Sequence, residues 1–510
     1  MTPSADPRAR AALPSFMAHP LAWLLALAAL HVLARLLLSP APKWDEAEQV
    51  LWSQRLALGY GAQPPLYTWL QWGMNQLLGV GVLSLAVLKH ALLVLTYVAM
   101  WLAGRELLGP RGAWWAAASM VLLPPLGWDS VRDQTHSVLV TAMACAAWWL
   151  LLRTVRQPRP RHFALLGLVC GLGLLAKYSF ALLAGALLLA ALSVPEARRA
   201  LRSRGWWWAP LVALLVVLPH ASWLAAHLGE ASAGTLQKMQ LQPGAGLAKG
   251  LRALLVDGLA STLALWVALA LAAFGAAWWR RPLTPAAPWA HRLFLRYLAL
   301  VLLALLALVL FGGVTSFRGR WVLPLLCMLP LAAFAARPEL QQHPGGARFT
   351  AAVVAVTLAI LLVAGLRPWV TSFRGHTDEL NHPAVELAAA LRQAGYDGRS
   401  PVIAADHMMA GMLRLRFPAA PVAACPPEAG AVAACVARLA AQAQRAGQGW
   451  LLISRADRLD PGWWTQARAG LAPPVAAEAV QSLALPFHMV PDGAPPARYQ
   501  YLWHPAQARP

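Results

Sequence analysis

The chain has 510 residues, of which 59% are hydrophobic and only 12% are charged. Soluble domains carry about 25% charged residues, so this composition excludes an ordinary soluble protein and indicates an integral membrane protein. The formal net charge of +21 does not indicate a nucleic-acid partner, because most arginines stand in short clusters between apolar runs, as cytoplasmic loops require.

Apolar runs of about 17–25 residues recur between Pro20 and Leu366, as bilayer-spanning helices require. They are continuous in Leu, Ala and Val and do not alternate with period two, which excludes a transmembrane β-barrel. Taking the arginine clusters as cytoplasmic gives about eleven crossings. The expected spans are 20–38, 80–103, 112–127, 137–152, 162–176, 179–194, 206–224, 258–279, 293–311, 321–336 and 349–366.

An odd number of crossings divides the chain into three parts. We expect a cytoplasmic segment over 1–19, a transmembrane domain over 20–370, and a domain on the outer side over 371–510. In a Gram-negative cell these positions correspond to the inner membrane, with the C-terminal domain in the periplasm. The first apolar run is long for a signal peptide and has a poor cleavage site, so we interpret it as a retained helix.

The first outer loop has the unusual sequence WDEAEQVLWSQRLALGYGAQPPLYTW, from Trp44 to Trp69. Asp45 to Leu58 has an amphipathic helical pattern, and the glycines around Tyr60 end it. The segment PPLYTWLQWGMNQLLG predicts a second helix with proline near its first turn. Its aromatic residues suit the headgroup level, so we expect two helices lying in the membrane interface.

Acidic residues gather on the outer side of the predicted membrane domain. Asp45 and Glu46 open the first outer loop, and Asp133, in GWDSVRDQTHSV, lies in the second. A carboxylate in this position can act as a general base on an acceptor hydroxyl. Alternatively, two carboxylates can bind a divalent metal together with a phosphate. The residues leave both roles open, and Glu48 is interpreted as a solvated acid.

Four basic residues stand on the outer side, against the positive-inside rule: Lys177 in GLLAKYSF, Arg318 and Arg320 in VTSFRGRWVLPLL, and Arg132 beside Asp133. Charges near the bilayer usually face a cavity and a partner, and a lipid phosphate fits this group. We add His136, Tyr60 and Gln63 as candidates for substrate binding. The histidines lack a metal-binding spacing such as His-Glu-x-x-His, so no metal ligands are assigned, although a divalent metal cofactor stays open.

From about Thr371 the composition becomes that of a small soluble α/β domain. HPAVELAAALRQAGYDG has the pattern of an amphipathic helix, and SPVIAAD, APVAAC and GWLLIS are short strand candidates. An alanine-rich helix is expected over Ala429–Ala446. Cys425 and Cys435 belong to this domain, in a compartment that permits disulfides, but their spacing alone leaves the pairing open.

Four stretches in this order resemble the bacterial relatives of the protein O-mannosyltransferases, which are glycosyltransferase family 39-like proteins of the GT-C fold. The stretches are WDEAEQVLWSQRLALGYGAQPPLYTWL, RDQTHS, GLLAKYSFALL and SFRGRWVLPLL. The lipid A aminoarabinose transferases and the rhizobial galacturonic acid transferases of lipopolysaccharide are similar in layout. The resemblance covers residues 20–366 and the placement of an outer C-terminal domain.

The resemblance implies that a sugar moves from a polyprenyl-phosphate donor to a hydroxyl of a glycolipid, glycan or protein acceptor at the outer face. By motif position, Asp45 looks like the catalytic carboxylate of the first loop, Glu46 stands beside it, and Asp133 looks like the acid of the second loop. The cations expected to neutralise the donor phosphate are Lys177, Arg318 and Arg320. The resemblance also implies direct displacement with inversion at the anomeric carbon.

Other functions compete with this interpretation. A transporter or lipid flippase often shows repeated halves and broken helices near the midplane, and this sequence shows no matching halves. A glycan polymerase or ligase would share the donor class but move a preassembled glycan. A scaffold gives no reason for cations on the outer face. No Walker loop or dinucleotide fingerprint is present, so a mechanism driven by a cytosolic nucleotide is unsupported.

Overall fold

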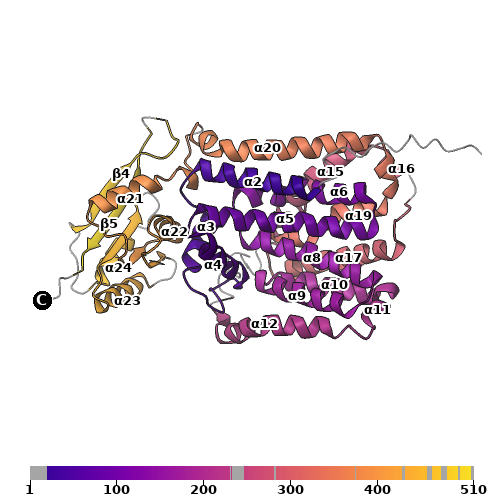
Figure 1. Ribbon diagram of the computed structural model, residues 1–510, viewed down its shortest axis with the longest axis horizontal. Helices are drawn as coiled ribbons and strands as arrows, with labels where there is room; N and C mark the ends of the chain where they lie inside the picture. The colour runs from indigo at the N-terminus through magenta and orange to yellow at the C-terminus, as the bar shows by residue number, and fades with distance from the viewer. Residues whose placement is uncertain are drawn as a thin grey trace, which may run out of the picture.

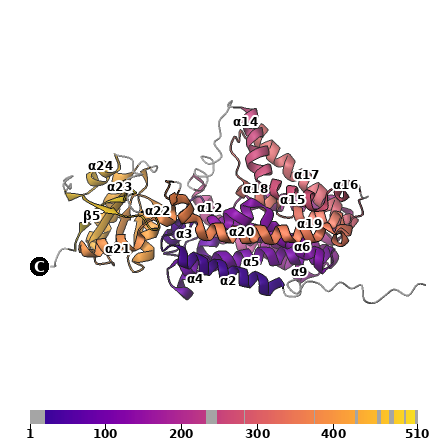
Figure 2. The ribbon, with the colours of Figure 1, turned by 90° about the horizontal axis from the view of Figure 1, so that it is seen from above.

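The computed structural model describes residues 20–229, 231, 246–280, 283–373, 375–427, 431–456, 462–471, 479–491 and 494–506. These residues form a bundle of long helices with a smaller part, which contains a β-sheet, at one end (Figure 1). The view turned by 90° shows the same separation and places α22 and α3 between the two parts (Figure 2). A mostly helical membrane protein with a small C-terminal sheet is therefore confirmed.

The bundle is built from apolar helices connected by short helical segments. Its first half comprises α2 (Pro20–Leu38), α3 (Trp44–Trp52), α4 (Leu66–Leu78), α5 (Val82–Leu107), α6 (Pro110–Ala118), η2 (Ser119–Leu122), η3 (Pro125–Asp129), α7 (Ser130–Arg132), α8 (His136–Arg156), α9 (Pro160–Ala176) and α10 (Phe180–Ser193). Its second half comprises α11 (Pro195–Leu201), α12 (Trp208–Ala226), α14 (Leu247–Arg252), η4 (Ala253–Ala260), α15 (Ser261–Phe274), α16 (Ala277–Arg280), α17 (Pro288–Leu310), α18 (Gly319–Leu326), α19 (Leu329–Ala336), η5 (Pro338–Gln342) and α20 (Gly345–Phe373).

Eight helices in the described residues are long and apolar enough to cross a membrane, or nine if the bent pair α10–α11 counts as one span. Of the eleven expected spans, 112–127 is broken into α6, a 3₁₀ turn and a π-helical turn, and α9 is only 17 residues long. The prolines at 124 and 125 explain the break, because proline lacks the N–H that the α-helical hydrogen bond needs. The count of eleven stays a prediction.

The first outer loop forms the two expected short helices, α3 and α4. The first one ends earlier than expected, at Trp52, where the Ser53 N–H bonds to the Gln49 carbonyl. The chain then turns through 53–65, and the Tyr60 hydroxyl accepts from the Ala57 N–H and donates to the Arg55 carbonyl. This local bonding orders the turn between the two helices.

The C-terminal part contains η6 (Glu379–Asn381), α21 (Ala384–Gln393), β1 (Val402–Ala404), α22 (His407–Arg416), β2 (Val422–Ala424), α23 (Val432–Arg445), β3 (Trp450–Arg455), α24 (Gly462–Ala469), β4 (Gln481–Leu485) and β5 (Ala497–His504). The strand order is β2-β1-β3-β5-β4. The first three strands are parallel, as βαβ connections require, and β5 runs antiparallel to both β3 and β4.

Both faces of this sheet are covered by helices. One hydrophobic cluster joins the strands to α21 and α22, and a second joins the other face to α23 and α24. The three strands expected from the sequence are present as β1, β2 and β3, and β4 and β5 are additional. Cys425 and Cys435 form a disulfide that ties the end of β2 to α23.

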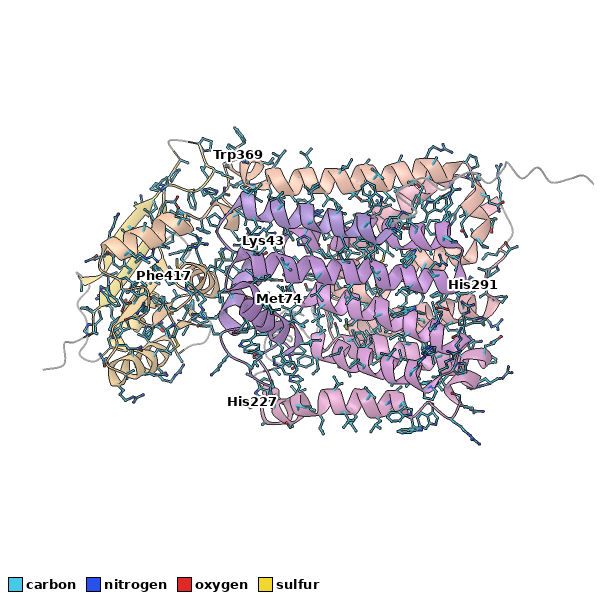
Figure 3. The ribbon with its side chains drawn as sticks, viewed as in Figure 1. Lys43, Met74, His227, His291, Trp369 and Phe417 are labelled. Atoms are coloured by element: carbon cyan, nitrogen blue, oxygen red, sulfur yellow. A yellow bond between two sulfur atoms is a disulfide. The ribbon has the colours of Figure 1, made fainter. Side chains whose placement is uncertain are left out.

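The first outer loop and the C-terminal part meet at the same end of the bundle. Figure 3 shows Lys43 and Trp369 at this end and His291 at the opposite end. α22 packs against α3 so closely that a Cβ on Gly411 would lie 2.5 Å from the Ala47 Cα. The Gln54 side chain donates to the Val422 carbonyl at 2.8 Å and accepts from the Val422 N–H at 2.9 Å. The C-terminal part from η6 to β5, called the sheet domain below, thus supports the helix that carries the first-loop acids.

Candidate active site

The two acids from the first and second outer loops lie side by side. The Asp45 backbone N–H donates to Oδ1 of Asp133 at 3.3 Å, although the two residues are 88 positions apart in the chain. α3 holds Asp45 in its first turn, and Asp133 follows α7 in an extended conformation just before α8. Both side chains are half-buried. Two carboxyl groups therefore converge at the end of the bundle that faces the sheet domain.

Glu46 has a different environment from its neighbour Asp45. Its Oε2 accepts from Arg35 at 2.8 Å and from the Lys43 N–H at 3.0 Å, while Oε1 pairs with Lys89 Nζ at 3.3 Å. These cations hold Glu46 ionised and keep its pKa well below the usual range, against the opposing effect of burial. These contacts occupy both of its oxygens, and the catalytic role expected for Glu46 stays a prediction.

Lys43 connects the two outer loops. Its side chain is 6% exposed, and its Nζ donates to the Val131 carbonyl at 2.9 Å. Val131 lies two residues before Asp133, so this bond holds the second loop against the start of α3. Burial and the neighbouring Lys89 cation lower the pKa of Lys43 well below its usual value.

The environment of Asp133 changes its acidity. Burial, reinforced by the neighbouring Asp45 carboxylate, raises the pKa of Asp133 to about 7. The carboxyl is therefore partly protonated at neutral pH, which reduces repulsion between the two acids. A pair of acids with different proton affinities can divide between them the roles of base and hydrogen-bond donor.

Beside the acids, His136 and Lys177 are held by two neighbouring sets of hydrogen bonds. Thr68 donates to the Gln49 side-chain oxygen at 2.9 Å, and Gln49 Nε2 lies 3.1 Å from His136 Nε2. His136 Nδ1 lies 3.2 Å from the Ala176 carbonyl, which fits a neutral ring that accepts at Nε2. The next residue, Lys177, donates from Nζ to Ser137 Oγ at 3.1 Å. The structure thus brings Lys177 and His136 close to the segment that carries Asp133.

The arginines of the last outer loop lie at the start of α18, which packs against α8 and η3. Arg318 is exposed, with its guanidinium 6.0 Å from the Trp321 ring centroid. Arg320 lies near Asp129. Burial raises the pKa of Asp129, and the positive charges of Arg132 and Arg320 act against this rise. Within the described residues, no hydrogen bond or ion pair joins Arg318 or Arg320 to Asp45 or Asp133.

Three further sequence candidates lie near this end of the bundle without forming one cluster. The Tyr60 hydroxyl bonds to the loop backbone, and Gln63 pairs with Tyr60 in an isolated β-bridge. Substrate binding by Tyr60 and Gln63 stays a prediction. Arg132 is exposed beside Asp133. In the described part of the chain, no three His, Cys, Asp or Glu side chains gather as a metal site.

Four charged residues near the site were not expected from the sequence: Arg35, Lys43, Lys89 and Asp129. Arg35 and Lys89 interrupt predicted spans, and a charge within an apolar run was a usable signal because such charges usually have buried partners. Lys43 directly precedes the acids, and Asp129 lies in the same second loop as Asp133. The contacts of Arg35 and Lys89 with Glu46 depend on how the helices rotate against each other, which the sequence does not contain.

Comparison with known proteins gives consistent matches. A family model described as dolichyl-phosphate-mannose-protein mannosyltransferase matches residues 62–223. The lipopolysaccharide core galacturonosyltransferase RgtB of Rhizobium johnstonii is 34% identical over 416 residues, which are 79% of this chain and 83% of that protein. RgtA, a lipopolysaccharide core galacturonosyltransferase of the same organism, is 34% identical over 77% of this chain and 79% of its own length.

A solved structure shares the fold. It is ArnT from Cupriavidus metallidurans bound to undecaprenyl phosphate, with a TM-score of 0.60, and the match covers 96% of this chain and 98% of that one. The sequence identity is 12%, so this likeness concerns the fold alone.

Proposed function

Because this chain belongs to the GT-C family of lipopolysaccharide galacturonosyltransferases and is a membrane glycosyltransferase, we propose that it transfers a uronic acid residue from a polyprenyl-phosphate carrier to a hydroxyl of the lipopolysaccharide core or lipid A. The reaction takes place on the outer side of the bacterial inner membrane. The family expected from the sequence is confirmed. The sugar is proposed from the names of the relatives, and the carrier from the name of the ArnT structure.

In this proposal Asp45 is the general base. Its carboxylate takes the proton of the acceptor hydroxyl while that oxygen attacks the anomeric carbon of the donor sugar. The bond between the anomeric carbon and the phosphate oxygen breaks, and the lipid phosphate leaves with both electrons of that bond. One direct displacement of this kind inverts the anomeric configuration.

The outer cations stabilise the leaving phosphate. Lys177, Arg318 and Arg320 are assigned this role, since cations directed at developing negative charge lower the barrier to its formation. The role of Lys177 is supported by its hydrogen bond to Ser137, which lies four residues after Asp133 in the chain. Both arginines stand at the start of α18, which packs against the helix that follows Asp133.

Asp133 is assigned a supporting role at the same centre. Its Oδ1 fixes the start of α3 through the Asp45 N–H, and its raised pKa allows a proton on the pair at neutral pH. Glu46, paired with Arg35 and Lys89, holds the same helix from within the bundle. The observation that carries the proposal is this convergence of Asp45 and Asp133 at the end of the bundle where the sheet domain lies.

The direct test uses purified full-length protein in nanodiscs, polyprenyl-phosphate-linked uronic acid, and lipopolysaccharide from a strain that lacks this protein. Mass spectrometry is expected to show loss of the donor and a gain of one uronic acid residue on the acceptor. A gain of a different sugar would correct the donor. Well-folded protein that consumes no lipid-linked sugar in the presence of this acceptor would contradict the proposed function.

A further inference from the structure

An open pocket of about 410 Å³ lies where the helical bundle meets the sheet domain. This volume falls within the range of ligand sites, about 300–1,000 Å³. Its walls come from the first loop, the second loop, the end of α20, α22 and β3. The lining residues that bear on its chemistry are Trp44, Trp128, Arg132, Arg367, His382 and Arg455.

The pocket opens beside the carboxylate pair. Trp44 directly precedes Asp45, and Arg132 directly precedes Asp133, so one lining residue is the chain neighbour of each acid. Since the Asp45 N–H bonds to Asp133, both neighbours are fixed close to the proposed reaction centre. Neither acid lines the pocket itself, so a molecule in it would lie against the chain neighbours of the two acids.

The cations of the pocket have unequal surroundings. Arg367 is paired with Asp378 at 2.5 Å and with Glu379 at 3.0 Å, so its charge is balanced by acids of the chain itself. Arg455 is 5% exposed, and its Nη1 lies 2.8 Å from His382 Nε2, which must accept that bond as a neutral ring. His382 thus holds the buried guanidinium of Arg455 in place.

Arg132 is the accessible cation of the pocket. Its side chain is exposed, and in the described part of the chain its guanidinium forms neither a hydrogen bond nor an ion pair. Its backbone carbonyl accepts from Arg367 at 3.4 Å, and Asp129 and Glu379 lie close enough for their charges to interact with that of Arg132. A guanidinium placed at a pocket mouth suits bidentate binding of a phosphate or a carboxylate.

Two indole rings complete the lining. Trp44 is 43% exposed, and Trp128 is half-buried on the opposite loop. A flat aromatic surface packs against the apolar C–H face of a sugar ring, while the ring hydroxyls bond to polar groups around it. Arginine and exposed tryptophan together therefore favour an anionic carbohydrate over a lipid tail.

We propose that this pocket binds the acceptor glycan, with a phosphate or carboxylate of an acceptor sugar on Arg132 and a sugar ring against Trp44. The inference rests on the proposed function and names the acceptor side of the same centre. A uronic acid donor also carries a carboxylate, so the shared chemistry is an anionic sugar. The experiment must therefore separate the donor from the acceptor.

Steady-state transfer would be measured for the wild type, Arg132→Ala, Arg132→Lys and the control Arg399→Ala, an exposed arginine outside the pocket. Lipopolysaccharide would be supplied intact and with its core phosphates removed by hydrofluoric acid. We expect Arg132→Ala to raise the KM for intact acceptor on the order of tenfold, since a hydrogen bond to a charged group is lost. We expect an unchanged donor KM, partial rescue by Arg132→Lys and no effect of Arg399→Ala.

The acceptor preference gives a second readout. If the anion on Arg132 is a phosphate, the wild type should prefer the phosphorylated acceptor and Arg132→Ala should lose that preference. If the anion is a carboxylate, the same comparison is made between intact acceptor and acceptor whose carboxylates are blocked with carbodiimide. A rise in the donor KM instead would assign the pocket to the donor sugar and overturn the inference. Unchanged KM values for both substrates would overturn it as well.

Direct binding separates this inference from the proposed function. Calorimetric titration of the full-length protein with water-soluble core oligosaccharide needs no donor and no turnover. Binding that weakens in Arg132→Ala would uphold the pocket even if no lipid-linked sugar were consumed. Donor consumption without any binding of the oligosaccharide would uphold the transferase and reject the pocket.

Discussion

Asp45 and Glu46 are neighbours in the first turn of α3, yet their surroundings differ, and we propose different roles for them. Glu46 is 2% exposed between Arg35 and Lys89, whereas Asp45 is half-buried beside Asp133. A carboxylate held by two buried cations is fixed and ionised, which suits a residue that positions the helix. A partly exposed carboxylate can take a proton from a substrate.

Glu46→Gln should therefore destabilise the protein more than Asp45→Asn does. The change leaves Arg35 and Lys89 buried without their counter-charge, and breaking a buried ion pair in this way costs about 3–5 kcal/mol. Thermal unfolding of the purified protein in detergent would show a clear fall in Tm for Glu46→Gln alone. Equal Tm values for the two variants would contradict the supporting role of Glu46.

The raised pKa of Asp133 predicts how stability depends on pH. The folded protein holds this proton up to about pH 7, whereas the unfolded chain releases it near pH 4, so stability contributed by the protonated form is lost as pH rises between these values. Asp133→Asn cannot ionise and should flatten the fall in Tm from pH 5 to pH 8. At most about 4 kcal/mol is involved, at 1.36 kcal/mol per pKa unit. The raised pKa of Asp133 would be contradicted if the wild-type Tm rose from pH 5 to pH 8 and the Tm of Asp133→Asn did not.

At the scale of elements, α3 is held from two sides. From the bundle, the Arg35–Glu46–Lys89 contacts and the Lys43 bond to Val131 fix its start. From the sheet domain, α22 packs against its middle, where Gly411 leaves room for the Ala47 backbone. A nine-residue helix is marginal by itself, so its position depends on these contacts.

Gly411→Ala should consequently lower activity without contacting any substrate. The added Cβ would meet the Ala47 Cα at 2.5 Å and push α3 away from α22. Displacement of a catalytic group by about 1 Å can cost on the order of 100-fold in rate. We expect kcat to fall at least tenfold while the donor KM changes little. Gly185→Ala in α10, where a Cβ meets open space, serves as the matched control, and equal activity of the two variants would contradict the role of α22.

At the scale of the whole molecule, the sequence predicts the features that depend on local pattern. The apolar runs predict the long helices. The predicted crossings put Asp45 and Asp133 on one side of the membrane, and they therefore predict that both acids lie at the same end of the bundle. The pairing of Glu46 with Lys89, and the pocket between Arg132 and Arg455, join segments that are far apart in the chain. Helix rotation and domain docking decide these contacts, and neither leaves a local pattern in the sequence.

The orientation of the bundle gives a further prediction. The sheet domain and the first outer loop lie at one end, whereas the arginine-rich ends of α8 and α11 lie at the other (Figure 1). The positive-inside rule then predicts that the sheet domain is periplasmic. Alkaline phosphatase fused after the C-terminus should be active, and a fusion after Gln157 should be inactive. The reverse pattern would place the reaction centre on the cytoplasmic side.

The central claim is that the Asp45 carboxylate carries the proton of the acceptor hydroxyl. The most direct measurement is single-turnover transfer from polyprenyl-phosphate-linked uronic acid to lipopolysaccharide by wild type, Asp45→Asn and Glu386→Gln, an exposed acid on α21. We predict that Asp45→Asn retains the wild-type Tm and donor binding but loses at least about 100-fold in rate, as expected for loss of a general base, while Glu386→Gln stays active. Transfer by folded Asp45→Asn at the wild-type rate would contradict the account.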